Sequence, residues 1–535
     1  MSIRSRLLAV AAVLTLGVAI AGVMPIPAQA ETILNRGFGA SPHTLDPHIN
    51  FGAREAWIQD DLYEGLVATA ADGKVIPGAA ERWDVSDDGK TITFHLRPNL
   101  KWSNGEPLVA QDFVNGMLRT LEPKTGSEKA YYFYNVIQIA GAAGYNDGSI
   151  TDPAQVGIKA PDEKTVVLSL DNPTPQAFFV LNSFQTTPLH KPSWEKFGEK
   201  FVEAGNQVGN GAYVLAENVP QSHVTLVRNP NYWDAANVKI DKVNYIVTED
   251  VNTELKRYQA GELDVTNEIP SDQREALKAE LGGEVREVIS TETFYFSFNI
   301  TKAPFDDIRV RQALSMAIDR ETLQEKVLKA GYKPSYSYVP AVDPTYDGPK
   351  VVEAGMSKEE REAKAKALLA EAGFGPDNPL KVGVLSTTDE VEKREALAIS
   401  LMWKQVLGVE SDLQNQEFQA WLDTFYAGNW DVFNDNIVGD FPGPETYLTY
   451  MKPSSDPGYN WKNQTYEDLL NKASAIADPQ ERSKVLAEAE KVLLDDYLVA
   501  PIASATSRHL VKPYVKGWID NVVESHPTRF MSIEQ

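Results

Sequence analysis

The chain has 535 residues, no cysteine and a formal net charge of −24 at pH 7. This length predicts more than one compact domain. The acidic balance argues against nucleic acid and anionic lipid as partners, and the missing thiols exclude disulfides, thiol catalysis and cysteine metal sites.

Residues 1–30 have the pattern of a secretory signal peptide. Arg4 and Arg6 form the charged region, residues 7–23 are an apolar run, and Ala28-Gln29-Ala30 is a cleavage site of the A-x-A type. The apolar run is short for a membrane span, which needs about 20 residues, so we expect cleavage before Glu31 rather than an anchor. A lipoprotein anchor would need a cysteine after the signal. The sequence therefore predicts the periplasm of a Gram-negative cell and no stable membrane insertion.

The first third of the mature chain is predicted to be rich in strands. Residues 91–96 alternate with period two, so that Ile92, Phe94 and Leu96 share one face. Further strands are predicted at residues 165–170, 224–227 and 243–247.

From about residue 305 the pattern changes to helices with strands between them. Asp307 is expected to cap a helix that runs through Leu323, and Ser357 begins a helix with a capping box that stops at Gly373. A strand is predicted at residues 381–385, a helix from Glu392 through Trp403, and a further helix from Asp478 and Pro479. This alternation indicates an α/β lobe with a mostly parallel sheet. Because no Ser/Gly linker separates the regions, packed and interleaved domains are expected.

Residues 438–448 look like the signature of a known family, and nine short motifs, in order along the chain, resemble those of the same family. The nine lie at residues 45–47, 61–66, 77–83, 101–107, 110–113, 209–213, 229–233, 258–264 and 304–314. Each motif is weak alone, but the ordered series resembles the bacterial extracellular solute-binding proteins of family 5, the peptide/nickel class that serves ABC importers. The fine spacing is closest to the oligopeptide-binding branch.

The resemblance implies an α/β fold like the type II periplasmic binding proteins, with two α/β lobes joined by a two-strand hinge and an extra inserted lobe. The hinge strands are expected near residues 291 and 491, and hinge closure would enclose the ligand. The expected division is a signal peptide at 1–30, a base lobe at 31–67, 190–291 and 492–535, an inserted lobe at 68–189, and an opposing lobe at 292–491.

The segment around Asp440 is expected to hold one end of a ligand. A carboxylate among Gly, Pro and aromatic residues is costly to bury unless a cation completes it, and the resemblance implies that Asp440 receives the amino terminus of a peptide. A turn-organising role is the alternative. The resemblance also implies that the backbone at Asn436 and Val438 pairs with the ligand like an added strand, and that Glu55 lines the same cleft. An ordinary buried strand and a solvated carboxylate at a helix start are the respective alternatives.

Several aromatic residues fall in segments that line the pockets of this family, although core packing is the simpler interpretation of each. They are Phe418, Trp421, Tyr131, Tyr132, Phe133 and Tyr134. The chain departs from the oligopeptide-binding pattern at the carboxyl end of the ligand. Two arginines used there align with Phe425 and Asn434, a histidine aligns with Val391, and no arginine lies between Arg394 and Arg482. Longer peptides, differently anchored peptides and ligands without a free carboxylate are left open.

The sequence thus predicts a monomeric periplasmic binder that captures oligopeptides and delivers them to an inner-membrane ABC permease. No catalytic residue, cofactor, metal or nucleic-acid partner is expected. Alternatives with the same fold carry a dipeptide, murein peptide, opine, nickel chelate or sugar. An enzyme is disfavoured because the S-x-x-K match at Ser193 and the K-T-G match at Lys124 occur in the wrong order for a serine β-lactamase, and S-D-N is absent.

Overall fold

The structure is a computed structural model that describes residues 31–50, 52–174, 176–452, 457–476 and 478–534. The predicted signal peptide lies outside the described residues. Within them, no helix is long and apolar enough to cross a membrane.

The first sheet joins segments from the beginning and the middle of the chain. β1 (Ile33–Gly37) runs parallel to β10 (Lys242–Ile246), and the sheet order is β1-β10-β9-β8. The core beneath it takes Leu34, Tyr245 and Trp518 from three distant stretches of sequence. Other elements of this region are α1 (Ala53–Leu62), β8 (Tyr213–Val219), β9 (His223–Arg228), α6 (Val251–Gln259), α7 (Arg274–Leu281), β17 (Val515–Lys516) and β18 (Ser532–Ile533).

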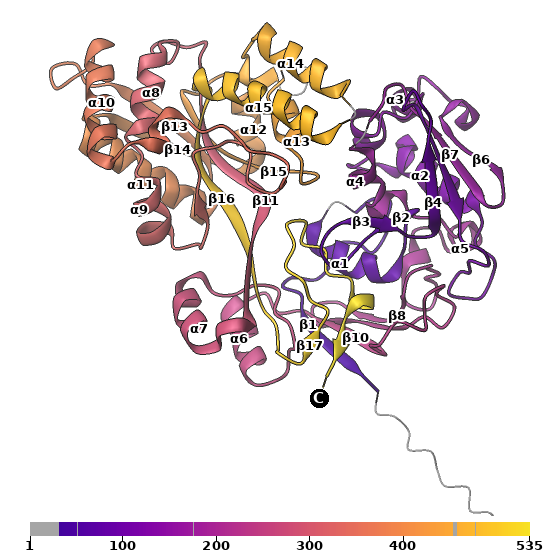
Figure 1. Ribbon diagram of the computed structural model, residues 1–535. Coiled ribbons are helices and arrows are strands. Elements are labelled where there is room, and N and C mark those ends of the chain that lie inside the picture. The colour runs from indigo at the N-terminus through magenta and orange to yellow at the C-terminus, as the bar shows by residue number, and fades with distance from the viewer. Residues whose placement is uncertain (1–30, 51, 175, 453–456, 477, 535) are drawn as a thin grey trace, which may run out of the picture.

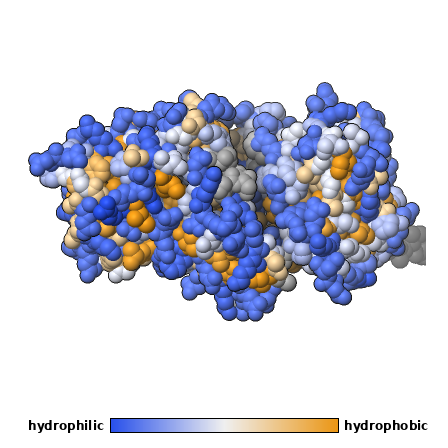
Figure 2. Space-filling model, turned by 90° about the horizontal axis from the view of Figure 1, so that it is seen from above, coloured by the Kyte–Doolittle hydropathy of each residue, from blue (hydrophilic) through white to orange (hydrophobic). Residues whose placement is uncertain are grey.

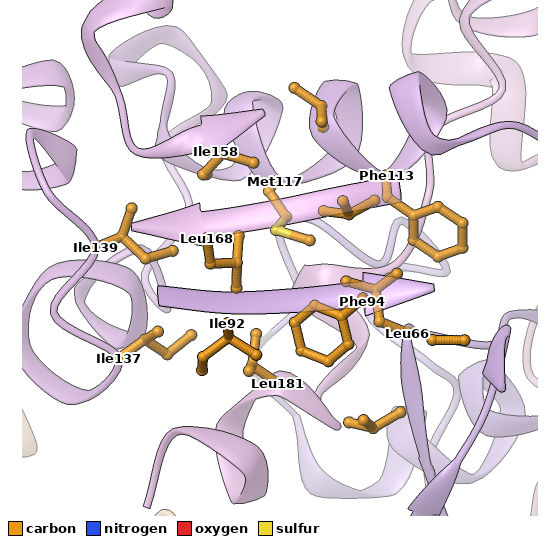
Figure 3. Packing of buried hydrophobic residues seen from close by; sticks show 14 of the residues in the cluster. Leu66, Ile92, Phe94, Phe113, Met117, Ile137, Ile139, Ile158, Leu168 and Leu181 are labelled. Carbon is orange, nitrogen blue, oxygen red and sulfur yellow. The ribbon is translucent and has the colours of Figure 1, made fainter. Parts of the chain in front are cut away.

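A second sheet has its own core. Its order is β4-β5-β7-β6, and Phe94 and Leu168 pack against Phe113 and Met117 of α2 (Ala110–Leu121), as Figure 3 shows. This confirms that Ile92 and Phe94 share a buried face of β5. The elements are β2 (Val67–Thr69), β3 (Val75–Pro77), β4 (Ala80–Val85), β5 (Thr91–Leu96), α2, α3 (Ala142–Asp147), β6 (Ile158–Asp162), β7 (Thr165–Ser169), α4 (Ala177–Leu181) and α5 (Lys191–Phe197).

The third sheet has the order β12-β16-β11-β15-β13-β14. It is mixed, which corrects the expectation of a mostly parallel sheet: β13 pairs in parallel with β14 and β15, whereas β11 and β16 pair antiparallel with their neighbours. Its strands are β11 (Val285–Phe298), β12 (Lys333–Pro334), β13 (Lys381–Thr387), β14 (Glu410–Gln416), β15 (Val432–Val438) and β16 (Val499–Leu510). Its helices are α8 (Ile308–Met316), α9 (Arg320–Thr322), α10 (Lys358–Glu371), α11 (Glu390–Leu407), α12 (Phe418–Tyr426), α13 (Pro444–Tyr450), α14 (Gln464–Ser474) and α15 (Pro479–Asp495).

Three helices begin at the capping residues predicted from the sequence. Asp307, Ser357 and Asp478 each accept a backbone N–H bond at the N-terminus of their helix, which confirms the three predicted starts. The helix expected to continue from Asp307 through Leu323 is interrupted after Met316, because Asp319 accepts a bond from the N–H of Thr322 and caps a new helix.

Two long antiparallel strands, β11 and β16, connect the upper and lower parts of the molecule (Figure 1). Their pairing extends from Val285 opposite Leu510 to Ser297 opposite Val499, with an irregular register between Ile289 and Thr293. The second hinge strand expected near residue 491 is a helix at that point, since α15 continues to Asp495. The crossing strand begins only at Val499. The lobe boundaries proposed from the sequence stay a prediction.

Candidate functional site

Asp440 lies just after β15, where the third sheet approaches the second core. The Tyr131 hydroxyl lies 2.8 and 2.9 Å from the two carboxylate oxygens of Asp440. The Tyr132 hydroxyl donates to Oδ1 at 2.9 Å, and the Lys129 ammonium lies 3.2 Å from the same oxygen. We call these four residues the Asp440 site. It joins a loop of the third sheet to a segment more than 300 residues earlier in the chain.

The two tyrosines act as hydrogen-bond donors in this site. Burial, and then the charge of Asp440, raise the pKa of both Tyr131 and Tyr132 well above its ordinary value. Both phenols therefore keep their protons, and the carboxylate accepts from them. Next to Asp440, Phe441 belongs to the core of the second sheet and stacks on Phe179 with ring centroids 5.8 Å apart. The contact between the two regions is thus partly apolar and partly charged.

The edge of β15 provides an extended stretch of backbone beside Asp440. On one side β15 pairs with β11 along its whole length, from Val432 to Val438. On the other side its register with β13 includes only Val432 and Phe433. Among the described residues, Asn434 to Val438 have no strand partner on that side. We call this stretch the β15 edge. It can accept an added strand, because unpaired N–H and C=O groups are a template for main-chain pairing.

The predicted residues Asn434, Asn436 and Val438 lie on one face of β15, as the period of two requires. Val438 is 61% exposed, whereas Asn434 is buried. The Asn436 amide donates to Oε1 of Glu292 at 2.6 Å, and the Asn434 amide donates to the backbone carbonyl of Glu392 at 3.4 Å. Both amides therefore hold acidic residues close to the β15 edge.

Three glutamates, Glu292, Glu392 and Glu395, form what we call the acidic end of the site. Burial raises the pKa of each, and the charge of Glu392 adds to the rise at Glu292 and Glu395. Among the described residues, none of the three forms an ion pair with lysine, arginine or histidine. The region around Asn434, which aligns with an arginine of the family pattern, thus carries carboxyl groups, which would repel a ligand carboxylate when ionised.

Stability should depend on the proton of Glu395. Burial raises its pKa from 4.5 to about 8. A carboxyl group whose pKa is raised by folding contributes stability that is fully present below its unfolded pKa and is lost as the pH rises through its folded pKa. Glutamine resembles the protonated form. We therefore expect Glu395→Gln to match the wild type near pH 4.5 and to exceed its unfolding free energy by on the order of 3 kcal/mol at pH 8.5.

Urea denaturation at the two pH values measures this difference. Glu410→Gln is the matched control, because Glu410 is exposed and pairs with Lys381 on the surface. An equal effect of Glu395→Gln at both pH values would contradict the assignment of a raised pKa.

The predicted aromatic residues separate into exposed and buried sets. Phe418 is 62% exposed and stacks on the buried Trp421 at 5.6 Å. Phe425 is only 2% exposed and packs against Phe433 at 4.4 Å, and Phe133 has no exposed surface. In this conformation Phe425 and Phe133 therefore contribute to packing and present no surface to a ligand.

Glu55 lies apart from the residues above. It is in the first turn of α1, and its Oε1 accepts the backbone N–H of His43 at 2.9 Å. This contact ties the loop before α1 to the helix and supports the structural alternative for Glu55. Among the residues that the structure describes, Glu55 makes no contact with Asp440 or with the β15 edge, so its role in ligand binding stays a prediction.

Sequence reasoning missed Lys129 and Glu292. Lys129 lies two residues before the flagged Tyr131, and its charge within an aromatic run was a usable signal. Glu292 lies next to the expected hinge position at residue 291, so only the pairing of β11 with β15 brings it to Asn436.

One group of described residues has donors for a metal ion: His509, Glu524 and His526, whose ligand atoms lie within 4.8 Å of one another. His509 Nε2 is 2.8 Å from Glu524, and its Nδ1 lies 3.1 Å from the Thr266 carbonyl. Although burial raises the pKa of Glu524, the neighbouring histidines lower it overall to well below its usual value. These contacts are those of a buried hydrogen-bonded ion pair.

Comparisons with known proteins identify the family to which the chain belongs. Residues 74–459 match the family model of the bacterial extracellular solute-binding proteins, family 5 Middle. The chain belongs to this family. It is 37% identical to the periplasmic oligopeptide-binding protein OppA of Salmonella typhimurium, with 92% of each chain covered. It is also 37% identical to the periplasmic murein peptide-binding protein MppA of Escherichia coli, over 92% of this chain and 91% of that one.

Solved structures of family members have the same fold. The unliganded open form of the murein tripeptide-binding protein MppA matches with a TM-score of 0.84 and 36% identity, covering 94% of this chain and 98% of that one. The complex of Haemophilus influenzae OppA with the peptide RPPGFSPFR matches with a TM-score of 0.76 and 34% identity, covering 94% and 99%. The chain is therefore a solute-binding protein with the α/β type II periplasmic binding fold.

Proposed function

We propose that this protein is the periplasmic solute-binding component of an ABC importer, and that it captures oligopeptides and delivers them to an inner-membrane permease. The observation that carries the proposal is the β15 edge: among the described residues, Asn434 to Val438 have no strand partner on the side away from β11, and this stretch leads directly to Asp440. Main-chain pairing gives affinity without reading side chains, which suits a carrier of many peptide sequences. The OppA and MppA relatives, named for peptide binding, support the same cargo.

In this proposal the peptide backbone pairs with the β15 edge and its α-amino group lies at the Asp440 site. Phe418 offers apolar contact close to β15, since it stacks on the buried Trp421, which in turn stacks on Phe433 at 4.5 Å. Closure would occur by bending of β11 and β16, which connect the two parts of the molecule (Figure 1). Seen from above, two bodies lie on either side of a central gap, and their visible surfaces are hydrophilic with scattered apolar patches (Figure 2).

Export precedes this function in the proposal. The protein would be secreted with cleavage after Ala30 and would act as a monomer in the periplasm, without a resident cofactor or metal. The charged start, the apolar run and the A-x-A site support this. The periplasmic names of the OppA and MppA relatives support the same compartment.

A thermal melt with a broad pool of short peptides tests the cargo. A ligand that binds only the folded state stabilises it by about 2.7 kcal/mol at 100 times its dissociation constant. We expect a clear rise in melting temperature and recovery of intact peptide afterwards. A melting temperature unchanged by the peptide pool would favour the alternative ligands: dipeptide, murein peptide, opine, nickel chelate or sugar. Recovery of cleaved peptide would indicate an enzyme.

The acidic end leads to a prediction about the ligand carboxylate. Phe425 and Asn434 align with the arginines of the family pattern, and Glu292, Glu392 and Glu395 lie around Asn434 and Asn436. We therefore expect that the described residues offer a peptide carboxylate no fixed cation there. Amidation of a peptide's C-terminus should change its affinity by less than the tenfold that 1.4 kcal/mol represents. Calorimetric titration of one peptide as free acid and as amide measures this. A much weaker amide would mean that a cation reaches the carboxylate in the closed form.

A further inference from the structure

Asp440 already has a cation of this chain beside it. The Lys129 ammonium lies 3.2 Å from Oδ1 of Asp440 and 3.3 Å from the Tyr131 hydroxyl oxygen. It also lies 4.9 Å from the ring centroid of Tyr132, within the range of a cation–π contact. The Lys129 and Asp440 side chains are only 24% and 22% exposed. Solvent therefore screens the pair less than it screens a fully exposed one.

One of the two carboxylate oxygens of Asp440, Oδ1, is already close to its hydrogen-bonding capacity. Oδ1 is within hydrogen-bonding distance of Tyr131, Tyr132 and Lys129, whereas Oδ2 has Tyr131 as its only donor among the described residues. A carboxylate offers about four lone-pair sites. A ligand ammonium could reach Oδ2, but it would then share one negative charge with the Lys129 ammonium. Two like charges at one carboxylate disfavour each other.

We infer that Lys129 determines ligand specificity by competing with the ligand's α-ammonium group for Asp440. The inference rests on the proposed function and concerns the charge that the Asp440 site accepts. With Lys129 present the site is close to neutral, so its preference for a free amine over an acylated amine is small. An N-acyl carbonyl can in addition accept a bond from the Lys129 ammonium, which a ligand ammonium cannot do.

Calorimetry on one peptide, prepared with a free and with an acetylated amino terminus, tests this inference. For Lys129→Met we expect the affinity for the free-amine peptide to rise about tenfold and that for the acetylated peptide to stay level or fall. The ratio of the two affinities then widens at least tenfold. Lys129→Gln, a second neutral variant, should behave in the same way, because the effect comes from the lost charge.

Two controls separate charge from shape. Lys129→Arg keeps a cation beside Asp440 and should keep the wild-type ratio. Lys124→Met removes an exposed lysine five residues earlier, with its side chain 90% exposed, and should leave both affinities unchanged. If Lys129 had a purely structural role, its substitution would lower the affinity for both peptides equally.

The outcomes distinguish the inference from the function on which it rests. If peptides bind but the ratio is unchanged in Lys129→Met and Lys129→Gln, or if the free-amine peptide binds more weakly, the inference is overturned and the proposed function stands. If neither peptide form, nor the broad peptide pool, binds the wild type or the variants, the proposed function fails and the inference falls with it.

Discussion

Asp440→Asn should weaken binding of a free-amine peptide by about 2–5 kcal/mol, the usual loss when one member of a hydrogen-bonded charged pair is removed from a desolvated contact. Asparagine keeps the shape of the side chain but cannot neutralise an ammonium group. Lys129 keeps its charge in this variant, so the ligand amine would face a cation without a balancing carboxylate. We expect the acetylated peptide to lose far less, since it brings no charge to the site.

Calorimetry on the matched peptide pair measures this difference. Asp423→Asn is the control: Asp423 is an exposed residue of the nearby helix α12, and Gln419 Nε2 lies 3.3 Å from its Oδ1. Equal losses for both peptides in Asp440→Asn would mean that Asp440 only organises the loop through its contacts with Tyr131, Tyr132 and Thr446.

Arg119→Met should destabilise the protein by about 3–5 kcal/mol, because it leaves a buried carboxylate without its counter-charge. Arg119 in α2 donates two bonds to Asp46, at 2.7 and 2.6 Å, and both side chains are buried. The same guanidinium lies 2.9 Å from His48 Nδ1. Burial, and then the charge of Arg119, lower the pKa of His48 to about 4, so in the wild type His48 is neutral at pH 7 and Arg119 supplies the charge that balances Asp46.

Urea denaturation at pH 7 measures the loss. Arg82→Met is the control, because Arg82 pairs with Asp84 on the surface, where solvent screens an ion pair and leaves it little effect on stability. A loss no greater in Arg119→Met than in this control would show that Asp46 finds other partners or takes up a proton.

Local chemistry explains which features could be predicted from the sequence. A cap such as Asp478 or Ser357 acts within four residues, so a short stretch of sequence contains all the information needed to place the helix start. The ordered motifs were sufficient to name the family for the same reason, since each is a local pattern. Asp440 was predicted as a ligand-binding residue from its own neighbours in sequence, and that role stays a prediction.

Long-range pairing explains the rest. The mixed sheet depends on β11 and β16 meeting across more than 200 residues, a contact that the local alternation of helix and strand does not encode. Lys129 and Asp440 are likewise more than 300 residues apart. The second hinge strand was expected too early because α15 remains helical through residue 491, with Leu486, Ala489 and Leu493 buried on one face. Residues from distant segments could be placed in the site only once the packing was known.

Native mass spectrometry of protein freshly purified from the periplasm tests the central claim most directly, since a peptide carrier that encloses its cargo should retain part of it. The account predicts a chain that begins at Glu31 and carries bound molecules of added mass. Denaturation should release these molecules, and sequencing should identify them as short peptides. The account also predicts that the Asp440→Asn protein retains less of them. A bound solute of another class, or peptide retention that does not change in Asp440→Asn, would contradict it.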